Sequence, residues 1–187
     1  EIQLGDWSSD VCSSDLGAGF IFSTAFGTAV VCGLWTGVCA GAASPMLVTW
    51  VGFVGCTSYF TAGCGRNGFI RSLCSNYMGI LIGCTIIALG NVVSSGVLFS
   101  ALCTGFFSGV ICYLSHCDLT KVAACTFMGG FSAFATGGNW QMLMLCLLLG
   151  NFVGLGSDYL GRFFYSKVYR GKTDKEDWVI FKLPEEN

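Results

Sequence analysis

Apolar residues occur along this chain in long runs, separated by short segments rich in Gly, Ser, Asn or Pro. The runs lack the regular alternation with polar positions that marks a helix with one face in water. A run of about 20 apolar residues crosses a bilayer as a helix, because backbone in lipid must satisfy its own hydrogen bonds. We therefore predict an all-α polytopic membrane helix bundle of about six transmembrane helices. The spans are expected at Phe20 to Ala40, Met46 to Ala62, Ser72 to Gly90, Val97 to Leu114, Leu119 to Thr136 and Trp140 to Gly161.

The composition points to the lipid bilayer as the main partner. Charged residues make up 11% of the 187 positions, against roughly 25% in a soluble domain. The hydrophobic share is 53%, and the mean hydropathy is +0.68. So few charges cannot cover a water-soluble surface, and we expect no nucleic-acid partner.

The two ends of the chain differ from the apolar middle. The run from Ser8 to Leu16 resembles a translated sequencing adapter, so we expect residues 1–16 to be a non-native N-terminal segment. Residues 17–162 are expected to form the six-helix transmembrane domain. Residues 163–187 mix Lys and Arg with acids and are expected to form a charged cytoplasmic tail.

The positions of the cations predict the orientation. The nine Lys and Arg residues follow predicted spans two, four and six only, at Arg66, Arg71, Lys121, Arg162, Lys167, Arg170, Lys172, Lys175 and Lys182. Positive charge is enriched in cytoplasmic connections. We therefore expect a multi-pass protein of the bacterial inner membrane with both termini in the cytoplasm.

The two halves of the chain contain a weak repeat. Phe53, Gly55, Ser58, Phe60 and Gly63 recur 74 positions later as Phe127, Gly129, Ser132, Phe134 and Gly137. Asn76 recurs at Asn151, and Gly33 and Gly37 recur at Gly105 and Gly109. Three predicted spans separate each pair, so matching helices would run in opposite directions, as in the inverted repeats of many transporters. We therefore expect an inverted 3+3 arrangement.

Two blocks resemble a known family. They are Trp50 to Phe60, and Phe127 to Ala135 together with Gly138-Asn139-Trp140. These blocks are similar to DUF 1097, a bacterial inner-membrane family of unknown function. The resemblance covers about Phe20 to Gly161 and implies a small multi-span protein. It supplies no catalytic or binding residues.

Metal and cofactor chemistry is not indicated. Twelve cysteines are present, but none form a C-x-x-C pair, and His116 is the single histidine. A zinc site normally needs three or four convergent ligands, whereas Cys within spans acts as a small apolar residue. We expect no metal, no cofactor and no catalytic residues.

Asp158 lies near the cytoplasmic end of the last predicted span. Arg162 follows four residues later on the same helix face, so we expect an interfacial ion pair. A role in proton coupling is the alternative, because ionisable groups in a bilayer are often functional.

Polar residues at matching positions of the repeat are candidates for lining a solute pathway: Ser58, Phe60, Asn76, Ser132, Phe134 and Asn151. Hydroxyls and amides can replace water around a small neutral solute. The alternative is that they hydrogen-bond neighbouring helices. Asn151 falls near the middle of its predicted span, whereas Asn76 falls near the start of its own, so either the boundary or the pairing is wrong.

Two functions are compatible with these patterns. The first is a small-solute channel or secondary transporter. The second is a non-transporting membrane subunit or scaffold that packs against a partner membrane protein. Glycine pairs such as Gly33-x-x-x-Gly37 allow close helix packing, within the chain or in a homo-oligomer. Nucleotide-binding and hydrolase motifs are absent from the sequence, so we do not expect an enzyme.

Overall fold

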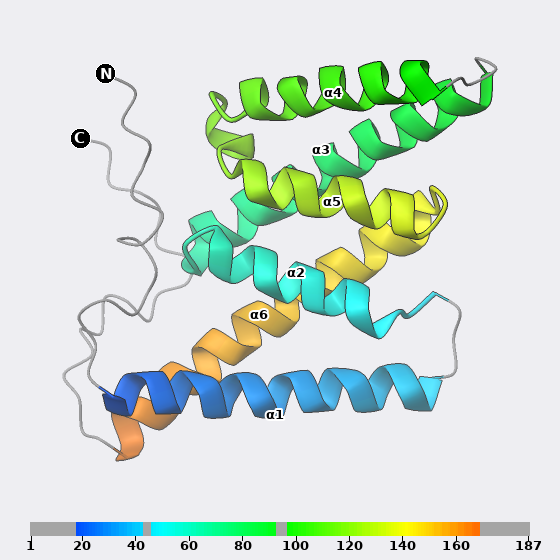
Figure 1. Ribbon diagram of the computed structural model, residues 1–187. Helices are drawn as coiled ribbons and strands as arrows, with labels where there is room; N and C mark the ends of the chain where they lie inside the picture. The colour runs from blue at the N-terminus through cyan, green and yellow to red at the C-terminus, as the bar shows by residue number, and fades with distance from the viewer. Residues whose placement is uncertain (1–17, 43–45, 93–96, 169–187) are drawn as a thin grey trace.

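The computed structural model describes residues 18–42, 46–92 and 97–168. These residues are helical throughout, apart from short turns, which confirms the all-α prediction. The elements are α1 (Ala18–Ala42), α2 (Thr49–Thr61), α3 (Gly65–Val92), α4 (Val97–Leu114), the 3-10 helix η1 (Asp118–Thr120), α5 (Ala123–Ala135) and α6 (Trp140–Val168). The helices run alternately in opposite directions, and α3 and α6 are inclined to α1 and α4 (Figure 1).

Three of these helices are long and apolar enough to cross a membrane: Ile21–Ala42 within α1, and all of α3 and α6. The helices α2 and α5 have 13 residues each. At about 1.5 Å per residue they are about 20 Å long, which is less than the ~30 Å hydrocarbon thickness. The expected number of six spans therefore stays a prediction.

The start of α3 corrects one sequence-based boundary. We predicted a connection from Gly63 to Arg71, but the chain turns within three residues and α3 begins at Gly65. Gly63, Cys64 and Gly65 have φ values of 94°, 59° and 64°, a left-handed stretch that reverses the chain abruptly. The polar residues after this turn lie in the first turns of a long helix. They resembled a loop in the sequence because a helix end outside the hydrocarbon needs no apolar residues.

The new boundary removes the mismatch between the two asparagines. Asn76 lies 76 − 65 = 11 positions after the start of α3, and Asn151 lies 151 − 140 = 11 positions after the start of α6. The pairing of these residues was therefore compatible with the fold, and the predicted boundary was at fault.

The helices α2 and α5 end in the same type of turn. Backbone N–H groups of Ala62, Gly63 and Cys64 donate to the carbonyls of Ser58, Phe60 and Tyr59 at 3.0, 3.2 and 3.3 Å. The three corresponding bonds after α5 run from Thr136, Gly137 and Gly138 to Ser132, Phe134 and Ala133, at 3.1, 3.2 and 2.9 Å. Every donor and acceptor is displaced by 74 positions. Left-handed glycines at Gly63 and Gly137 make this ending possible.

Two parallel helix pairs form the centre of the bundle. The helix α2 runs along α6, because Val48 contacts Cys146 while Tyr59, further along α2, contacts Asp158. The helix α5 runs along α3 in the same way (Figure 1). The helix α1 packs on the other side of α6, whereas α4 lies at the opposite edge and touches α3 and α5 only lightly.

The outer surface of the bundle is apolar and the charges lie at one end. Large side chains such as Leu34, Leu102 and Phe106 are 64–68% exposed. Among the described residues, every Lys, Arg and acid lies near the start of α3, the α4–α5 connection or the last turns of α6. These segments share one end of the bundle with the start of α1 (Figure 1). The opposite end carries no charge in the part of the chain that the structure describes.

Candidate functional site

The central helix pairs approach until their backbones touch, and glycine makes this possible. A Cβ atom at Gly55 would lie 2.6 Å from the carbonyl oxygen of Leu147 and 2.9 Å from the Cα of Gly150. In the other pair, a Cβ at Gly129 would overlap the backbone of Asn76, and one at Gly79 would overlap the carbonyl of Thr126. Small residues at such positions let membrane helices pack closely. Each crossing thereby brings an asparagine of a long helix against a short helix.

The interior between these helices contains polar as well as apolar side chains. Eleven polar or charged residues of the described chain are buried: Ser23, Ser58, Ser72, Ser75, Asn76, Thr120, Thr126, Ser132, Asn151, Ser157 and Asp158. Apart from Asp158 they are neutral hydroxyls and amides. This composition suits hydrogen bonding to a neutral partner.

Ser58 and Asn76 form the first polar contact of the interior. The Ser58 hydroxyl lies 3.1 Å from Oδ1 of Asn76 and 3.3 Å from Sδ of Met128. The Cys125 thiol donates to the backbone carbonyl of Ser58 at 3.4 Å. Side chains from α2, α3 and α5 therefore meet at this junction.

Asn151 forms the second polar contact, between α3 and α6. Its Oδ1 accepts a hydrogen bond from the hydroxyl of Ser72. Its Nδ2 donates to the carbonyl of Leu147 at 2.9 Å. Both ends of this amide are therefore used within the protein.

Asn76 differs from Asn151 in this respect. Its Nδ2 has no hydrogen-bond partner, and neither has the hydroxyl of Thr126. Both side chains are fully buried. A buried polar atom without a partner costs about 1–3 kcal/mol, so each such atom calls for an explanation.

The candidate residues taken from the repeat occupy different environments. Ser58 contacts Asn76 rather than Ser132, whose hydroxyl donates to the carbonyl of Met128 at 2.7 Å on its own helix. Phe60 is half-buried against the cluster that contains Trp35 and Val153. Phe134 is 45% exposed on the outer surface. The structure thus brings Ser58 and Asn76 together.

The ion pair expected between Asp158 and Arg162 is present, with Nε 2.8 Å from Oδ1. Asp158 is also linked across the bundle, because the Tyr59 hydroxyl donates to its Oδ2 at 3.0 Å. The Tyr59 oxygen in turn accepts the Gly65 backbone N–H at 2.8 Å. We expected an interfacial pair only, whereas the carboxylate is buried and also ties α6 to the α2–α3 turn.

Sequence reasoning missed Ser72, Thr126 and Tyr59. Ser72 was placed at a span boundary, and Thr126 corresponds to Gly52 in the repeat, so neither stood out as a matched polar pair. Tyr59 carried no signal, because an aromatic residue in an apolar run is usually packing. The wrong start of α3 hid the depth of Ser72 and Asn76 alike.

The cysteines serve the packing of the helices. Cys146 receives the Val48 N–H at 3.3 Å and donates to the Met46 carbonyl at 3.0 Å. The described residues include no group of three His, Cys, Asp or Glu that could hold a metal. His116 lies against the ring of Tyr113, with centroids 5.7 Å apart.

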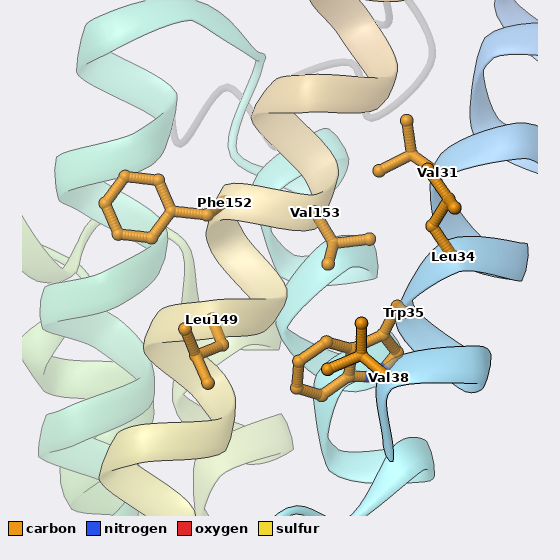
Figure 2. Close-up of a pocket in the computed structure, with 7 residues that line it drawn as sticks. All are labelled: Val31, Leu34, Trp35, Val38, Leu149, Phe152 and Val153. Atoms are coloured by element: carbon orange, nitrogen blue, oxygen red, sulfur yellow. The ribbon is translucent and has the colours of Figure 1, made fainter. Parts of the chain in front are cut away.

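An open apolar groove of about 290 Å³ lies between α1 and α6 (Figure 2). Its lining is Val31, Leu34, Trp35, Val38, Leu149, Phe152 and Val153. The one polar atom of these side chains, Nε1 of Trp35, donates to the carbonyl of Thr49 at 3.1 Å. Gly52 leaves the room for this indole, because a Cβ there would overlap the ring. The groove therefore suits an acyl chain and offers nothing to a polar solute.

The known proteins to which this chain is similar are named as inner membrane proteins or as uncharacterized. The chain is 34% identical over 121 residues to an uncharacterized protein, YahC, of Escherichia coli, covering 62% of this chain and 73% of YahC. It is 30% identical over 137 residues to the inner membrane protein YcdZ of Salmonella typhimurium, covering 72% of this chain and 82% of that protein. No solved structure matches. The family described as a protein of unknown function, DUF1097, matches residues 25–162, and the chain belongs to this family.

Proposed function

We propose that this is a multi-pass inner-membrane protein with six spans, and that it is a small-solute channel or secondary transporter made of two inverted three-helix halves. The observation that carries the proposal is the polar interior. Ser58, Asn76, Ser72 and Asn151 are fully buried between helices whose outer faces are apolar. In a bilayer such a strip offers polar surroundings away from the water on either side.

Several features support the location. A relative is named an inner membrane protein. The described charges gather at one end of the bundle, as the positive-inside rule expects for a cytoplasmic face. Helices shorter than the bilayer are compatible with six spans, because irregular backbone is tolerated where protein covers it. The Gly65 N–H after α2, for example, is satisfied by the Tyr59 hydroxyl.

Several features also support the inverted repeat. The turns after α2 and α5 share their three hydrogen bonds at an offset of 74. Gly55 meets the backbone of α6 beside Asn151, and Gly129, its partner in the repeat, meets the backbone of α3 at Asn76. Asn76 and Asn151 each lie 11 positions, about 16 Å at ~1.5 Å per residue, after the start of their own helix. Transporters with inverted repeats bind their solutes between the halves.

Flux into liposomes that hold the purified protein tests the proposal. Small neutral and anionic solutes would be added outside, and swelling or tracer uptake would be compared with that of empty liposomes. We expect at least one neutral solute to enter faster with the protein present. Uptake at the rate of empty liposomes for every solute would refute transport.

Ser58→Trp and Thr57→Trp form a matched pair for this assay. Ser58 is fully buried at the three-helix junction, whereas the neighbouring Thr57 is exposed on the outer face of α2. We expect Ser58→Trp to abolish the flux and Thr57→Trp to preserve it. Equal loss in both variants would mean that the polar interior is not the pathway.

A second function, a non-transporting subunit that packs against a partner, is favoured by one observation. A Cβ at Gly33, Gly37, Gly105 or Gly109 would meet no described atom within 4 Å, so these glycines serve no close packing within the described part of the chain. They are free to pack against another helix in a homo-oligomer or a complex. Native mass spectrometry of Gly33→Leu and Gly105→Leu tests this idea. A complex that dissociates in these variants, combined with no flux in the wild type, would favour the subunit over the transporter.

A further inference from the structure

The two unpartnered atoms of the interior lie at the same helix crossing. Gly79 packs on the carbonyl of Thr126, and Gly129 packs on the backbone of Asn76. Asn76 and Gly79 are three positions apart on α3, and Thr126 and Gly129 are three positions apart on α5. Residues with this spacing share a helix face, so Asn76 and Thr126 both lie within one turn of the same contact, each before the glycine of its own helix.

These atoms leave a surplus of hydrogen-bond donors. The Oδ1 of Asn76 already accepts from Ser58, so its amide offers two unused N–H groups. The Thr126 hydroxyl offers one unused O–H. A carbonyl oxygen has two lone pairs and matches one N–H from Asn76 and the O–H from Thr126.

The surroundings favour an uncharged molecule. The helices α2 and α5 carry no charged residue, and α3 carries none after Arg71. A carboxylate held there would lose its water without gaining a cation, which is costly. A neutral carbonyl compound loses far less.

The other half of the molecule provides an internal comparison. Asn151, the repeat partner of Asn76, uses both ends of its amide within the protein. The repeat partner of Thr126 is Gly52, which has no side chain. If these polar residues served only to pack the helices, nothing would explain why both unpaired atoms lie in the same half of the repeat and at one helix crossing.

Resting on the transport function proposed above, we infer that Asn76 Nδ2 and Thr126 Oγ1 form a solute-binding site for a small uncharged molecule with a carbonyl oxygen, such as a simple amide. Both residues are fully buried, so a solute reaches them only when the helices around them separate.

Thr126→Val tests the site, because valine has nearly the shape of threonine but no hydroxyl. Thr57→Val is the matched control, since the Thr57 hydroxyl is exposed and bonded to the Phe53 carbonyl at 2.9 Å. The probes are acetamide, acetate as an anion of the same shape, and glycerol as a neutral solute without a carbonyl. We expect acetamide to be the fastest of the three, and Thr126→Val to slow it about tenfold while glycerol changes about twofold or less. If Thr126→Val slows all three probes equally, or slows none of them, the proposed site is wrong, whereas the transport function is unaffected.

Heat stability gives a readout that does not depend on flux. Because the Thr126 hydroxyl has no partner, Thr126→Val should unfold at the same or a higher temperature than the wild type. If no probe crosses faster than in empty liposomes, the proposed transport function is wrong. The site is then tested by the effect of acetamide on the unfolding temperature. Acetamide that raises the unfolding temperature of the wild type but not of Thr126→Val supports the site. No rise in the wild type, or a clear loss of stability in Thr126→Val, overturns it.

Discussion

The hydroxyl of Tyr59 on α2 donates a hydrogen bond to the carboxylate of Asp158 on α6, with 3.0 Å between the oxygens. The same hydroxyl oxygen accepts the Gly65 N–H at the start of α3, and Arg162 holds the other carboxylate oxygen. A single phenol thus connects three helices at the charged end of the bundle. Removing it would leave a backbone N–H and a buried carboxylate oxygen short of a partner.

We therefore expect Tyr59→Phe to lower the free energy of unfolding by about 1–3 kcal/mol. Unfolding in detergent, followed by circular dichroism, measures the change. Tyr113→Phe is the control, because Tyr113 is 76% exposed and its substitution should have little effect. Equal stability of the two variants would show that the Tyr59 hydroxyl does not hold these helices together.

Substitution by alanine should change stability in opposite directions at glycines in the helix crossings and at glycines on the outer faces. Gly79→Ala and Gly129→Ala place a methyl group on the backbone of the opposite helix and should destabilise the protein by about 1–3 kcal/mol. Gly33→Ala and Gly105→Ala meet open space and should be neutral, or stabilise the helix by up to about 1 kcal/mol. Unfolding temperatures of the four variants provide the measurement. Destabilisation by Gly33→Ala or Gly105→Ala would instead indicate that an unseen neighbour packs there.

The two asparagines should differ in their contribution to stability. Asn151→Leu removes two hydrogen bonds within the protein and should cost about 1 kcal/mol, given ~0.6 kcal/mol for each such bond in membrane proteins. Asn76→Leu removes one bond together with an unpaired N–H group, so it should cost less. Chemical unfolding of the two variants side by side measures the difference. A larger loss for Asn76→Leu would mean that its amide has a structural partner.

Reporter fusions test the proposed orientation. A phosphatase that is active only in the periplasm would be joined after Gly138, at the uncharged end of the bundle, and after Asn187. We expect activity after Gly138 and none after Asn187, because positively charged connections stay in the cytoplasm. A fusion after His116, in the connection that carries Lys121, should also be inactive. Activity after Asn187 would reverse the orientation.

The predicted N-terminal segment, residues 1–16, lies outside the described residues. Of the predicted tail, residues 163–187, the first six continue α6 to Val168, and the rest lie outside the described residues. Within the described part, most helix positions followed from hydrophobicity, because a long apolar run must form a helix if lipid surrounds it. The ends of the helices were harder to predict. Gly65 to Arg71 contains polar residues that suit a loop as well as a helix start, and only the left-handed turn at Gly63–Gly65 decides between the two.

The sequence by itself determined the class of fold, the apolar surface and the four-residue spacing of Asp158 and Arg162. These features depend on composition or on spacing along one helix. The candidate solute-lining residues came from the repeat and stay predictions. Tertiary structure alone decided that Ser58 contacts Asn76, that Ser72 contacts Asn151, and that Thr126 lies unpaired at the same crossing as Asn76. These contacts join residues on different helices. Their formation depends on where glycine lets two backbones meet, and spacing along one chain does not specify which glycine meets which helix.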